Sequence, residues 1–338
     1  MASHPPVDTL GRALQSLRIS VTDRCNLRCQ YCMPAEIYGK DFAFLPRSEI
    51  LAFEELQTVA AAFVNLGVRQ IRVTGGEPLL RKDIAVLIGQ LRELGPEIDL
   101  SLTTNGTRLG QLAAPLQEAG LDRINVSLDS LDPQTASSLA GRPVEPERVW
   151  QNLLLARETG LSMKVNCVIK RGLNEEAAIP LAERCRNEGI PLRFIEFMDV
   201  GITNEWQKRD VVTGREILDQ LSDKWPLLPV SDQSITETAR RYRYKDGAGE
   251  VGFINSISEP FCRGCNRARI SADGTLYTCL FASTGWPVKR WIREDALAGK
   301  DLVNRIAACW GKREDRYSEL RGARVDTSKR PEMWTLGG

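Results

Sequence analysis

The stretch LRISVTDRCNLRCQYCMPAE, residues 17–36, decides how the rest of this 338-residue chain is interpreted. It begins with a short β-type run at residues 17–22 and continues directly into Cys25, Cys29 and Cys32, which have CxxxCxxC spacing. In a reducing compartment, cysteines clustered in this way are typical of a metal site rather than of disulfides. The stretch therefore predicts a strand whose carboxyl end leads into a metal centre.

The composition is that of an ordinary globular protein with an unusual shortage of histidine. Hydrophobic residues make up 42% and charged residues 26%, and the length predicts about two domains of roughly 150 residues each. The 45 basic and 44 acidic residues give a net charge of +1, which argues against a protein that binds a nucleic-acid backbone. With His4 as the only histidine, a His-dependent triad and a His₃ zinc site are excluded.

The terminal sequence and the apolar runs predict a cytoplasmic protein that does not enter a membrane. No N-terminal stretch has the basic, apolar and small-residue order of a signal peptide. The longest apolar runs, such as residues 59–64, fall far short of the roughly 20 residues that span a bilayer. Thiols stay reduced in the cytoplasm, so we expect the clustered cysteines to be metal ligands.

From residue 16 to residue 200, short β-type runs alternate with longer amphipathic segments. The strand candidates are residues 17–22, 70–74, 99–104, 123–128, 164–169 and 192–197. The helix candidates between them are residues 53–66, 82–94, 109–119, 146–159 and 175–188, each followed by a glycine that marks its end. This alternation predicts parallel strands with right-handed crossovers, as in an open or partial (β/α) barrel. A doubly wound sheet has the same alternation.

After residue 200 the alternation stops. We expect a helix at residues 213–221, short strands at 242–244 and 250–254, a hairpin within 269–280 that turns at Asp273-Gly274, and a helix at 301–310. The predicted division is a flexible N-terminus (1–15), a barrel (16–210), a C-terminal α+β region (211–322) and a flexible tail (323–338) that ends in Gly337-Gly338.

A second group of three cysteines brackets the predicted hairpin: Cys262, Cys265 and Cys279. Structural zinc normally takes four protein ligands, whereas each triad here offers three and His4 cannot complete both. A [4Fe–4S] cluster on three cysteines keeps one iron open for a substrate or cofactor, and we favour this interpretation. Two zinc sites completed by carboxylate or water are the alternative. The lone cysteines are interpreted as buried structural thiols: Cys167, Cys185 and Cys309.

Several motifs together connect the chain to a known family. The CxxxCxxC triad, followed by GGEP at residues 75–78 after the second strand, resembles the radical S-adenosylmethionine (SAM) enzymes. The motifs FCRGCNRARISADGTLYTCLF, TTNGT, VSLD, KVNCVIKRGLN and RFIEFMDVG, with the terminal Gly-Gly, resemble the GTP 3′,8-cyclase family of molybdenum cofactor biosynthesis from about residue 17 to residue 338. The resemblance implies an α/β fold, namely a partial (β/α)6 TIM-type barrel with a C-terminal α+β extension that holds a second Fe–S cluster.

The resemblance also implies cofactors and site residues. The cofactors are SAM and two [4Fe–4S] clusters, the first on Cys25, Cys29 and Cys32 and the second on Cys262, Cys265 and Cys279. The positions that match SAM contacts are Tyr31, Gly76, Ser127 and Met198. Those that match GTP contacts are Arg18, Arg72, Thr103, Lys164, Arg267 and Arg269, and we add the strand-end Arg193. Besides the first triad, the expected catalytic elements are Arg267, Arg269, Gly337 and Gly338.

The implied reaction begins when one electron cleaves SAM to methionine and a 5′-deoxyadenosyl radical. That radical takes the C3′ hydrogen of GTP, C3′ bonds to C8 of guanine, and reduction gives 3′,8-cyclo-7,8-dihydroguanosine 5′-triphosphate. The implied partners are a flavodoxin- or ferredoxin-type electron donor and, downstream, cyclic pyranopterin monophosphate synthase; a homodimer is compatible with the sequence. Gln70 and Leu336 depart from the Lys and Ile that are usual in the family.

Two other functions remain open from the sequence. One is another radical SAM enzyme with an auxiliary cluster, for example one that modifies a peptide. The other is a non-catalytic zinc-binding nucleotide module, which a colourless, iron-free protein would indicate. For the GTP 3′,8-cyclase reaction, both sets of cysteines are expected to be essential. The peptide-modifying alternative is less favoured, because such enzymes usually have more than three C-terminal cysteines and the basic positions here suit a triphosphate.

Overall fold

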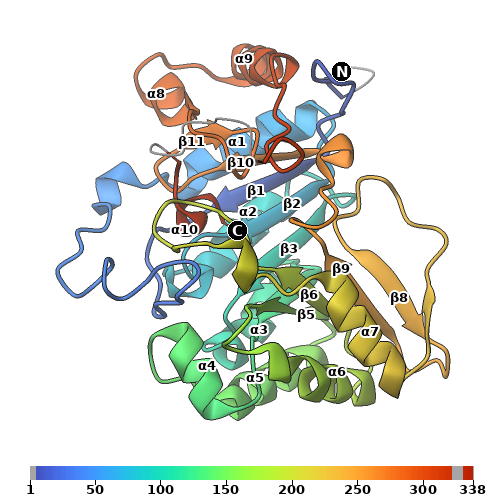
Figure 1. Ribbon diagram of the computed structural model, residues 1–338. Coiled ribbons are helices and arrows are strands. Elements are labelled where there is room, and N and C mark those ends of the chain that lie inside the picture. The colour runs from blue at the N-terminus through green and yellow to red at the C-terminus, as the bar shows by residue number, and fades with distance from the viewer. Residues whose placement is uncertain (1–4, 322–329, 338) are drawn as a thin grey trace.

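The computed structural model describes residues 5–321 and 330–337. Within these residues, a 12-stranded sheet has the order β12-β11-β10-β1-β2-β3-β4-β5-β6-β9-β8-β7 (Figure 1). Strands β1 to β6 are parallel neighbours in sequence order, which is the arrangement that successive right-handed crossovers produce. The sheet is open, because β12 and β7 are its two edges. The predicted partial barrel is therefore confirmed, and a doubly wound order is excluded.

The six predicted strands all form, with ends that shift by at most two residues. They are β1 (Ser16–Ser20), β2 (Gln70–Thr74), β3 (Asp99–Thr104), β4 (Arg123–Ser127), β5 (Ser162–Ile169) and β6 (Leu192–Glu196). The connecting helices are α1 (Phe53–Asn65), α2 (Ile84–Arg92), α3 (Leu109–Glu118), α5 (Pro146–Glu158) and α6 (Ala178–Asn187). Short 3-10 turns lie at Arg47–Glu49, Pro78–Leu80, Glu175–Ala177, Lys208–Asp210 and Cys262–Gly264.

Within the barrel region, one helix, α4 (Pro133–Ala140), was not expected from the sequence. It begins at Asp132, whose side chain accepts a 2.8 Å hydrogen bond from the backbone N–H of Thr135 and so caps the helix. Its eight residues bury only Ala136, Leu139 and Ala140. This apolar face is too short for its helical period to stand out in the sequence.

The two faces of the sheet differ in chemistry because side chains alternate along each strand. On β1, Leu17 and Ile19 are fully buried among the helices, in the same core as Val73 of β2. The residue between them, Arg18, belongs to the opposite face. Polar side chains can therefore gather inside the curved sheet, while the helices cover its outside (Figure 1).

The C-terminal region extends the barrel sheet at both edges instead of forming a separate layer. At one edge, β9 (Glu250–Ile254) runs parallel to β6 and is followed by β8 (Arg240–Tyr244) and β7 (Leu227–Pro229). At the other edge, β10 (Arg267–Ile270) runs parallel to β1 and forms the predicted hairpin with β11 (Thr275–Tyr277), which β12 (Trp286–Pro287) follows. The remaining helices are α7 (Gly214–Lys224), α8 (Val288–Arg293), α9 (Gly299–Gly311) and α10 (Met333–Leu336).

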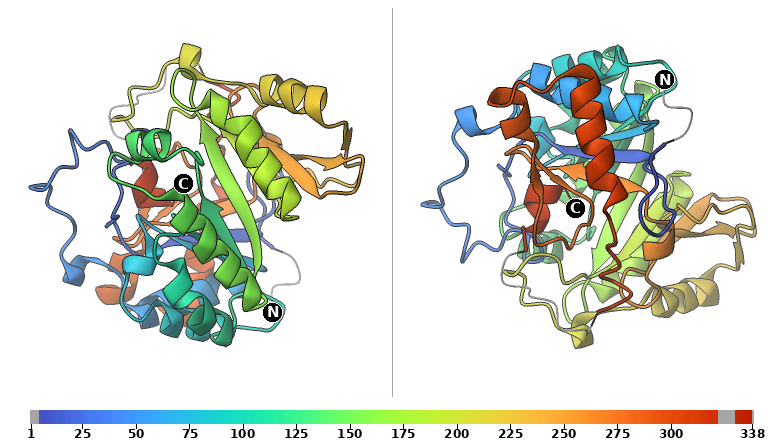
Figure 2. Two further views of the ribbon diagram at one scale, coloured as in Figure 1. Left: turned by 90° about the horizontal axis from the view of Figure 1, so that it is seen from below. Right: turned by 90° about the horizontal axis from the view of Figure 1, so that it is seen from above.

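Residues 5–15 and 330–337 are packed, where we expected flexible ends. Residues 5–15 form a turn closed by the bridge between Val7 and Ala13, and Asp8 and Arg12 are buried. This segment lies beside the end of α9 (Figure 2). At the other end, α10 buries Trp334 and Leu336. The reason in both cases is burial against distant parts of the chain; residues 322–329 and Gly338 lie outside the described residues.

The helices give no sign of a membrane span. Among the residues that the structure describes, no helix combines the length and the apolar character needed to cross a bilayer.

Candidate functional site

Three arginines stand in one row across the inner face of the sheet. In the register of β10, β1 and β2, Arg269 is paired with Arg18, and Arg18 with Arg72. Like charges directly opposite on neighbouring strands repel each other. Burial, followed by the neighbouring Arg269 and Arg72, lowers the pKa of Arg18. Because an arginine stays protonated even so, the row is a concentrated positive charge that an anion would stabilise.

Further basic side chains lie beside this row and line a cavity together with Arg18 and Arg72. This cavity, which we call the basic cavity, is lined by Arg18, Arg72, Arg123, Lys164, Arg193 and Arg267, and also by Gln70. Burial and then the nearby Arg193 lower the pKa of Lys164 to about 8. Arg123 is already engaged, because its guanidinium forms a two-pronged ion pair with Asp99. The basic cavity therefore has the positive charge that a polyphosphate needs. In the described part of the chain, no aromatic residue that could stack on a nucleotide base lines it.

The second cysteine triad lines an adjoining cavity, here called the second-triad cavity. It contains Cys262, Cys265 and Cys279 and shares Arg18, Arg72, Arg193 and Arg267 with the basic cavity. Burial alone would raise the pKa of Cys265, but the positive charges of Arg267 and Arg313 outweigh it and bring the value down to about 6. A thiolate at neutral pH is the form that binds metals.

The first triad lies in the loop after β1, in a cavity separate from that of the second triad. Cys25, Cys29 and Cys32 line a first-triad cavity together with Tyr31, Gly76, Ser127 and Met198. Burial, and then the charge of Glu77, raise the pKa of Cys25 to about 11. The Cys25 sulfur accepts a hydrogen bond from the Leu27 N–H at 3.4 Å. Metal binding would have to displace its proton, as is usual for thiol ligands.

The donor sets of both triads fit iron–sulfur clusters. All six thiols are unpaired with one another, and within each triad all three line one cavity. Among the described residues, no three histidine, cysteine or carboxylate side chains are grouped closely enough to hold a single metal ion. A [4Fe–4S] cluster differs in that each cysteine binds a different iron.

The GGEP segment forms a close-fitting wall beside the first triad. A Cβ placed on Gly76 would lie 2.4 Å from the carbonyl oxygen of Arg24, so only glycine fits there. Glu77 is buried and accepts hydrogen bonds from the N–H of Asn105 (2.8 Å) and the hydroxyl of Thr104 (2.7 Å). The segment thus contacts both the cysteine loop, at Arg24, and the end of β3, at Thr104. Gly76 itself lines the first-triad cavity.

A carboxylate, Asp129, and an amide, Asn105, also line the first-triad cavity, and neither of them was assigned a role from the sequence. The hydroxyl of Tyr31 donates a 2.7 Å hydrogen bond to Asp129, which also accepts from the Val168 N–H at 2.9 Å. Burial raises the pKa of Asp129 to about 6. The amide of Asn105 lies 4.0 Å from the Cys25 sulfur. Both residues stand within quoted motifs, TTNGT and VSLD, which is the signal that could have found them.

Thr103 and Asn166 connect the two triad cavities. Each lines both the first-triad and the second-triad cavity. Thr103 Oγ1 and Asn166 Oδ1 are buried and have no hydrogen-bond partner among the described residues. Buried polar atoms without partners are rare and point to a bound group that completes them. Asn166 was missed by sequence reasoning, although it lies in the KVNCVIKRGLN motif.

The C-terminal tail enters this interior. Arg269 Nη1 donates to the carbonyl oxygens of Leu336 (3.2 Å) and Gly337 (3.1 Å), and Arg18 Nη1 donates to that of Gly337 (3.2 Å). A Cβ on Gly337 would lie 2.0 Å from Thr74 Cγ2, and its φ of +63° also favours glycine. Gly337 thus lies at the arginine row, while Gly338 lies outside the described residues.

An aromatic box anchors the same tail beside the first triad. The ring of Trp334 meets those of Tyr38, Phe42 and Phe44 edge-on at centroid distances of 5.5, 6.2 and 6.3 Å. Cys25 and Cys32 pack against this group. Sequence reasoning did not single out Trp334, because its role depends on a box nearly 300 residues earlier in the chain.

Comparisons with known proteins agree with this arrangement. The chain matches the Radical SAM superfamily over residues 19–185 and Molybdenum Cofactor Synthesis C over residues 190–319. A protein of Acidothermus cellulolyticus named GTP 3′,8-cyclase is 48% identical over 331 residues, 97% of this chain and 91% of that protein. A protein of the same name from Staphylococcus aureus (strain JH9) is 43% identical over 335 residues, 98% of each chain.

A solved structure has a similar fold. The crystal structure of Streptococcus suis SuiB bound to S-adenosylmethionine superposes with a TM-score of 0.60 at 17% identity, covering 94% of this chain and 69% of that one. The structure of SuiB bound to the precursor peptide SuiA gives the same score at 18% identity, over 96% and 70%. At these identities the likeness concerns the fold alone.

Proposed function

The chain belongs to the GTP 3′,8-cyclase family of radical SAM enzymes, and we propose that its three adjoining cavities bind SAM, GTP and two iron–sulfur clusters. The reaction of this family is the cyclisation of GTP to 3′,8-cyclo-7,8-dihydroguanosine 5′-triphosphate, the first step of molybdenum cofactor biosynthesis. The enzyme is a lyase that uses SAM and an Fe–S cluster.

The first-triad cavity is the place for SAM. When bound to the cluster on Cys25, Cys29 and Cys32, SAM supplies a 5′-deoxyadenosyl radical after one-electron reduction. The chain's own part is to hold and orient the cofactor: Gly76 offers exposed backbone, and Tyr31 is fixed by its hydrogen bond to Asp129. Ser127 and Met198 complete the assigned contacts. Burial of this cavity excludes water from a reactive radical.

The basic cavity is the place for the triphosphate of GTP. About four negative charges on the substrate would match the in-register Arg18 and Arg72, together with Lys164 and Arg193. Thr103, whose hydroxyl has no partner among the described residues, supplies a polar contact between the first-triad and second-triad cavities. Gln70, in place of the usual Lys, lines the basic cavity together with these cations.

The second-triad cavity is the place for the guanine base. Cys262, Cys265 and Cys279 would hold the second [4Fe–4S] cluster, whose open iron can bind the base. Arg267 and Arg269 stand beside it, and Arg267 Nη2 lies 3.4 Å from the Cys265 sulfur. In this arrangement GTP spans the second-triad and basic cavities, and its ribose faces the SAM cavity across Thr103 and Asn166.

One observation supports the proposal above all others. The two cysteine triads line separate cavities that share Thr103, Asn166 and Met198, and the arginine row borders only the second of them. This is the arrangement needed by an enzyme that forms a radical at one cluster and binds a nucleotide at the other. The concentration of arginine favours a polyanionic substrate such as a triphosphate over a neutral peptide, and a zinc-binding nucleotide module would need neither a SAM cavity nor a docked tail.

Iron analysis and a product assay test the proposal together. Anaerobically purified and reconstituted protein should contain about eight irons and eight sulfides, and a Cys262→Ser/Cys265→Ser/Cys279→Ser variant about four. With GTP, SAM and a reductant, mass spectrometry should detect the cyclised triphosphate only in the unsubstituted protein. About four irons without the substitutions would contradict the second cluster. A peptide product with no GTP turnover would contradict the assigned substrate.

The remaining partners are part of the same proposal. A flavodoxin- or ferredoxin-type protein would supply the electrons, and cyclic pyranopterin monophosphate synthase would take up the product. The nine cysteines are all unpaired in the described chain, which supports the reducing cytoplasm as the place of action. Pull-down from the source cell's lysate under anaerobic conditions, followed by activity with the captured reductant, tests the electron donor.

A further inference from the structure

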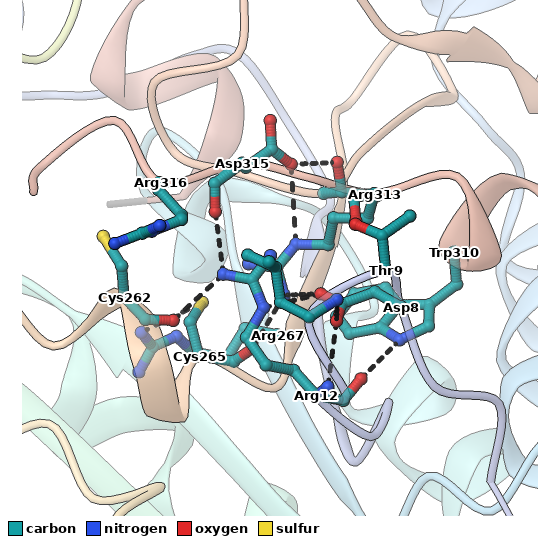
Figure 3. Close-up of polar contacts among 12 residues, drawn as sticks. Asp8, Thr9, Arg12, Cys262, Cys265, Arg267, Trp310, Arg313, Asp315 and Arg316 are labelled. Carbon is teal, nitrogen blue, oxygen red and sulfur yellow. Dashed lines mark hydrogen bonds and ion pairs between the residues drawn. The ribbon is translucent and has the colours of Figure 1, made fainter. Parts of the chain in front are cut away.

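A buried ion network joins the N-terminal segment to the second triad (Figure 3). The carboxylate of Asp8 accepts from Arg12 Nε at 2.6 Å and from Arg313 Nη1 at 3.2 Å. The side chains of Arg12, Arg313 and Asp8 are 4%, 1% and 0% exposed. The two guanidiniums therefore share the one fully buried carboxylate of the network, and the other carboxylate that faces Arg313, Asp315, is partly exposed to solvent.

Each arginine of this network also binds the backbone of the triad. Arg12 Nη1 donates to the carbonyl oxygen of Cys262 at 3.0 Å, and Arg313 Nη1 donates to that of Cys265 at 2.7 Å. Figure 3 shows both guanidiniums beside these two cysteines. The positive charge of the network is thus directed at two of the three residues that would hold the second cluster.

The remaining cysteine of the second triad, Cys279, is connected to the network through Asp315. Its carboxylate accepts from Thr278 Oγ1 at 2.6 Å, next to Cys279, and lies 3.4 Å from Arg313 Nε. Its backbone carbonyl accepts from Arg12 Nη1 at 2.7 Å. The side chain of Asp315 is 28% exposed, so solvent screens its charge more than that of Asp8.

The network is also incomplete as it stands. Arg12 Nη2 is buried and has no hydrogen-bond partner among the described residues. A buried donor without a partner costs about 1–3 kcal/mol, and a native structure retains one where a bound group can use it. The rest of the segment is well anchored: Trp310 Nε1 donates to the Arg12 carbonyl at 2.9 Å, and Thr9 Oγ1 to that of Arg313 at 2.7 Å.

We propose that Arg12 and Arg313 are positioning residues that raise the reduction potential of the second cluster, and that Asp8 limits this effect by balancing one of their two charges. The inference rests on the proposed second cluster. One-electron reduction of a [4Fe–4S]²⁺ cluster makes it more negative, and nearby positive charges and N–H dipoles stabilise that state. The electron comes from the reductant, and no bond in the network is made or broken.

The sign of the effect distinguishes this role from a merely structural one. Arg12→Gln and Arg313→Gln each remove a positive charge and should shift the midpoint potential to more negative values. Asp8→Asn removes the balancing negative charge and should shift it to more positive values. Arg12→Lys keeps the charge and should restore most of the potential lost in Arg12→Gln. Structural damage alone would move all these variants in one direction.

The experiment is a redox titration of the full chain, followed by electron paramagnetic resonance. A Cys25→Ser/Cys29→Ser/Cys32→Ser background leaves the second cluster as the only signal. In that background each glutamine variant should lower the ratio of reduced to oxidised cluster at a fixed potential by about tenfold, a shift of about 59 mV for one electron. Arg305→Gln is the matched control, because Arg305 is an exposed arginine of α9 whose guanidinium lies over Trp291; its midpoint should not change.

The outcomes separate the inference from the proposed function. A background protein with no iron at all refutes the second cluster, and the inference with it. A full cluster with unchanged midpoints in both glutamine variants overturns the inference alone, as does a negative shift in Asp8→Asn. If the glutamine variants fail to hold iron, Asp8→Asn and Arg12→Lys decide: a positive shift in the first with a near-native value in the second supports the proposal, and any other pair overturns it.

Discussion

Arg269 Nη1 donates a 3.1 Å hydrogen bond to the carbonyl oxygen of Gly337, so the hairpin of the second triad holds the next-to-last residue of the chain. The same carbonyl is bound by Arg18. The tail therefore occupies two guanidiniums of the arginine row at the point where the proposed substrate site begins.

Altering this tail should separate SAM cleavage from cyclisation. Deletion of Gly337 and Gly338 removes the contacts of the Gly337 carbonyl with Arg18 and Arg269, and Gly337→Ala puts a Cβ 2.0 Å from Thr74 Cγ2 at a positive φ. We expect both variants to form 5′-deoxyadenosine but at least tenfold less cyclised product, measured by mass spectrometry. Gly311→Ala is the control, because its Cβ would meet nothing within 4 Å. Unchanged product formation after the deletion would contradict a role for the tail.

Lys164 predicts a pH dependence of GTP binding. Its pKa is lowered to about 8 by burial and by Arg193, and a bound triphosphate would raise it again. GTP binding should therefore take up a proton above pH 8, and affinity should fall as pH rises from 8 to 9.5, by up to tenfold per unit. Calorimetry in buffers of different ionisation enthalpy measures both effects. Lys164→Arg stays charged throughout this range and should flatten the profile; an equally steep profile in that variant would assign the dependence to another group.

Gly76 and Gly89 provide a matched pair of alanine substitutions. A Cβ at Gly76 would lie 2.4 Å and 2.7 Å from the carbonyl oxygen and carbon of Arg24, both backbone atoms that cannot easily move. Gly76→Ala should weaken SAM binding by about 1–3 kcal/mol, measured by equilibrium binding. Gly89→Ala meets nothing within 4 Å in the middle of α2 and should raise stability by about 0.5–1 kcal/mol. Native SAM affinity in Gly76→Ala would show that this wall does not contact the cofactor.

Trp334 should control how firmly the tail is docked. Its ring is 8% exposed and packs edge-on against three aromatic rings, so Trp334→Ala should cost the docked state about 3 kcal/mol. The expected result is faster hydrogen exchange at residues 333–336 and loss of cyclised product, with little change in the melting temperature of the barrel. Trp334→Phe keeps part of the packing, so its hydrogen exchange and product formation should lie between those of the unsubstituted protein and those of Trp334→Ala. A large drop in melting temperature would mean that Trp334 supports the whole fold.

The barrel and the cysteine triads were predictable because their signals are local. The strand Gln70–Thr74 has the predicted bounds, and so does Asp99–Thr104, since apolar runs ending in turn residues need no distant partner to be recognised. The triads are compact in the sequence, so that their spacing and ligand number favoured iron–sulfur clusters while leaving zinc open, and the neighbouring motifs added the family resemblance.

The parts that were missed depend on distant contacts. Residues 5–15 resemble a polar terminus, but Asp8 is buried by an ion pair with Arg313, more than 300 residues away. Helix α4 depends on one cap at Asp132 rather than on a long apolar face. The pairing of both C-terminal hairpins with the barrel sheet could not be inferred either. It joins residues far apart in the sequence, such as Ser16 with Arg267 and Leu192 with Val251, and such pairing leaves no mark in the local pattern.

The pairing of Ser16 on β1 with Arg267 on β10 also has a consequence for biosynthesis. A ribosome that adds about 5–20 residues per second needs roughly 12 to 50 s to extend the chain from Ser16 to Arg267. During that time β1 presents an open strand edge, and such edges promote aggregation. The nascent chain therefore depends on rapid completion or on a chaperone that shields β1, and overexpression at lower temperature with added chaperones should increase the yield of folded enzyme.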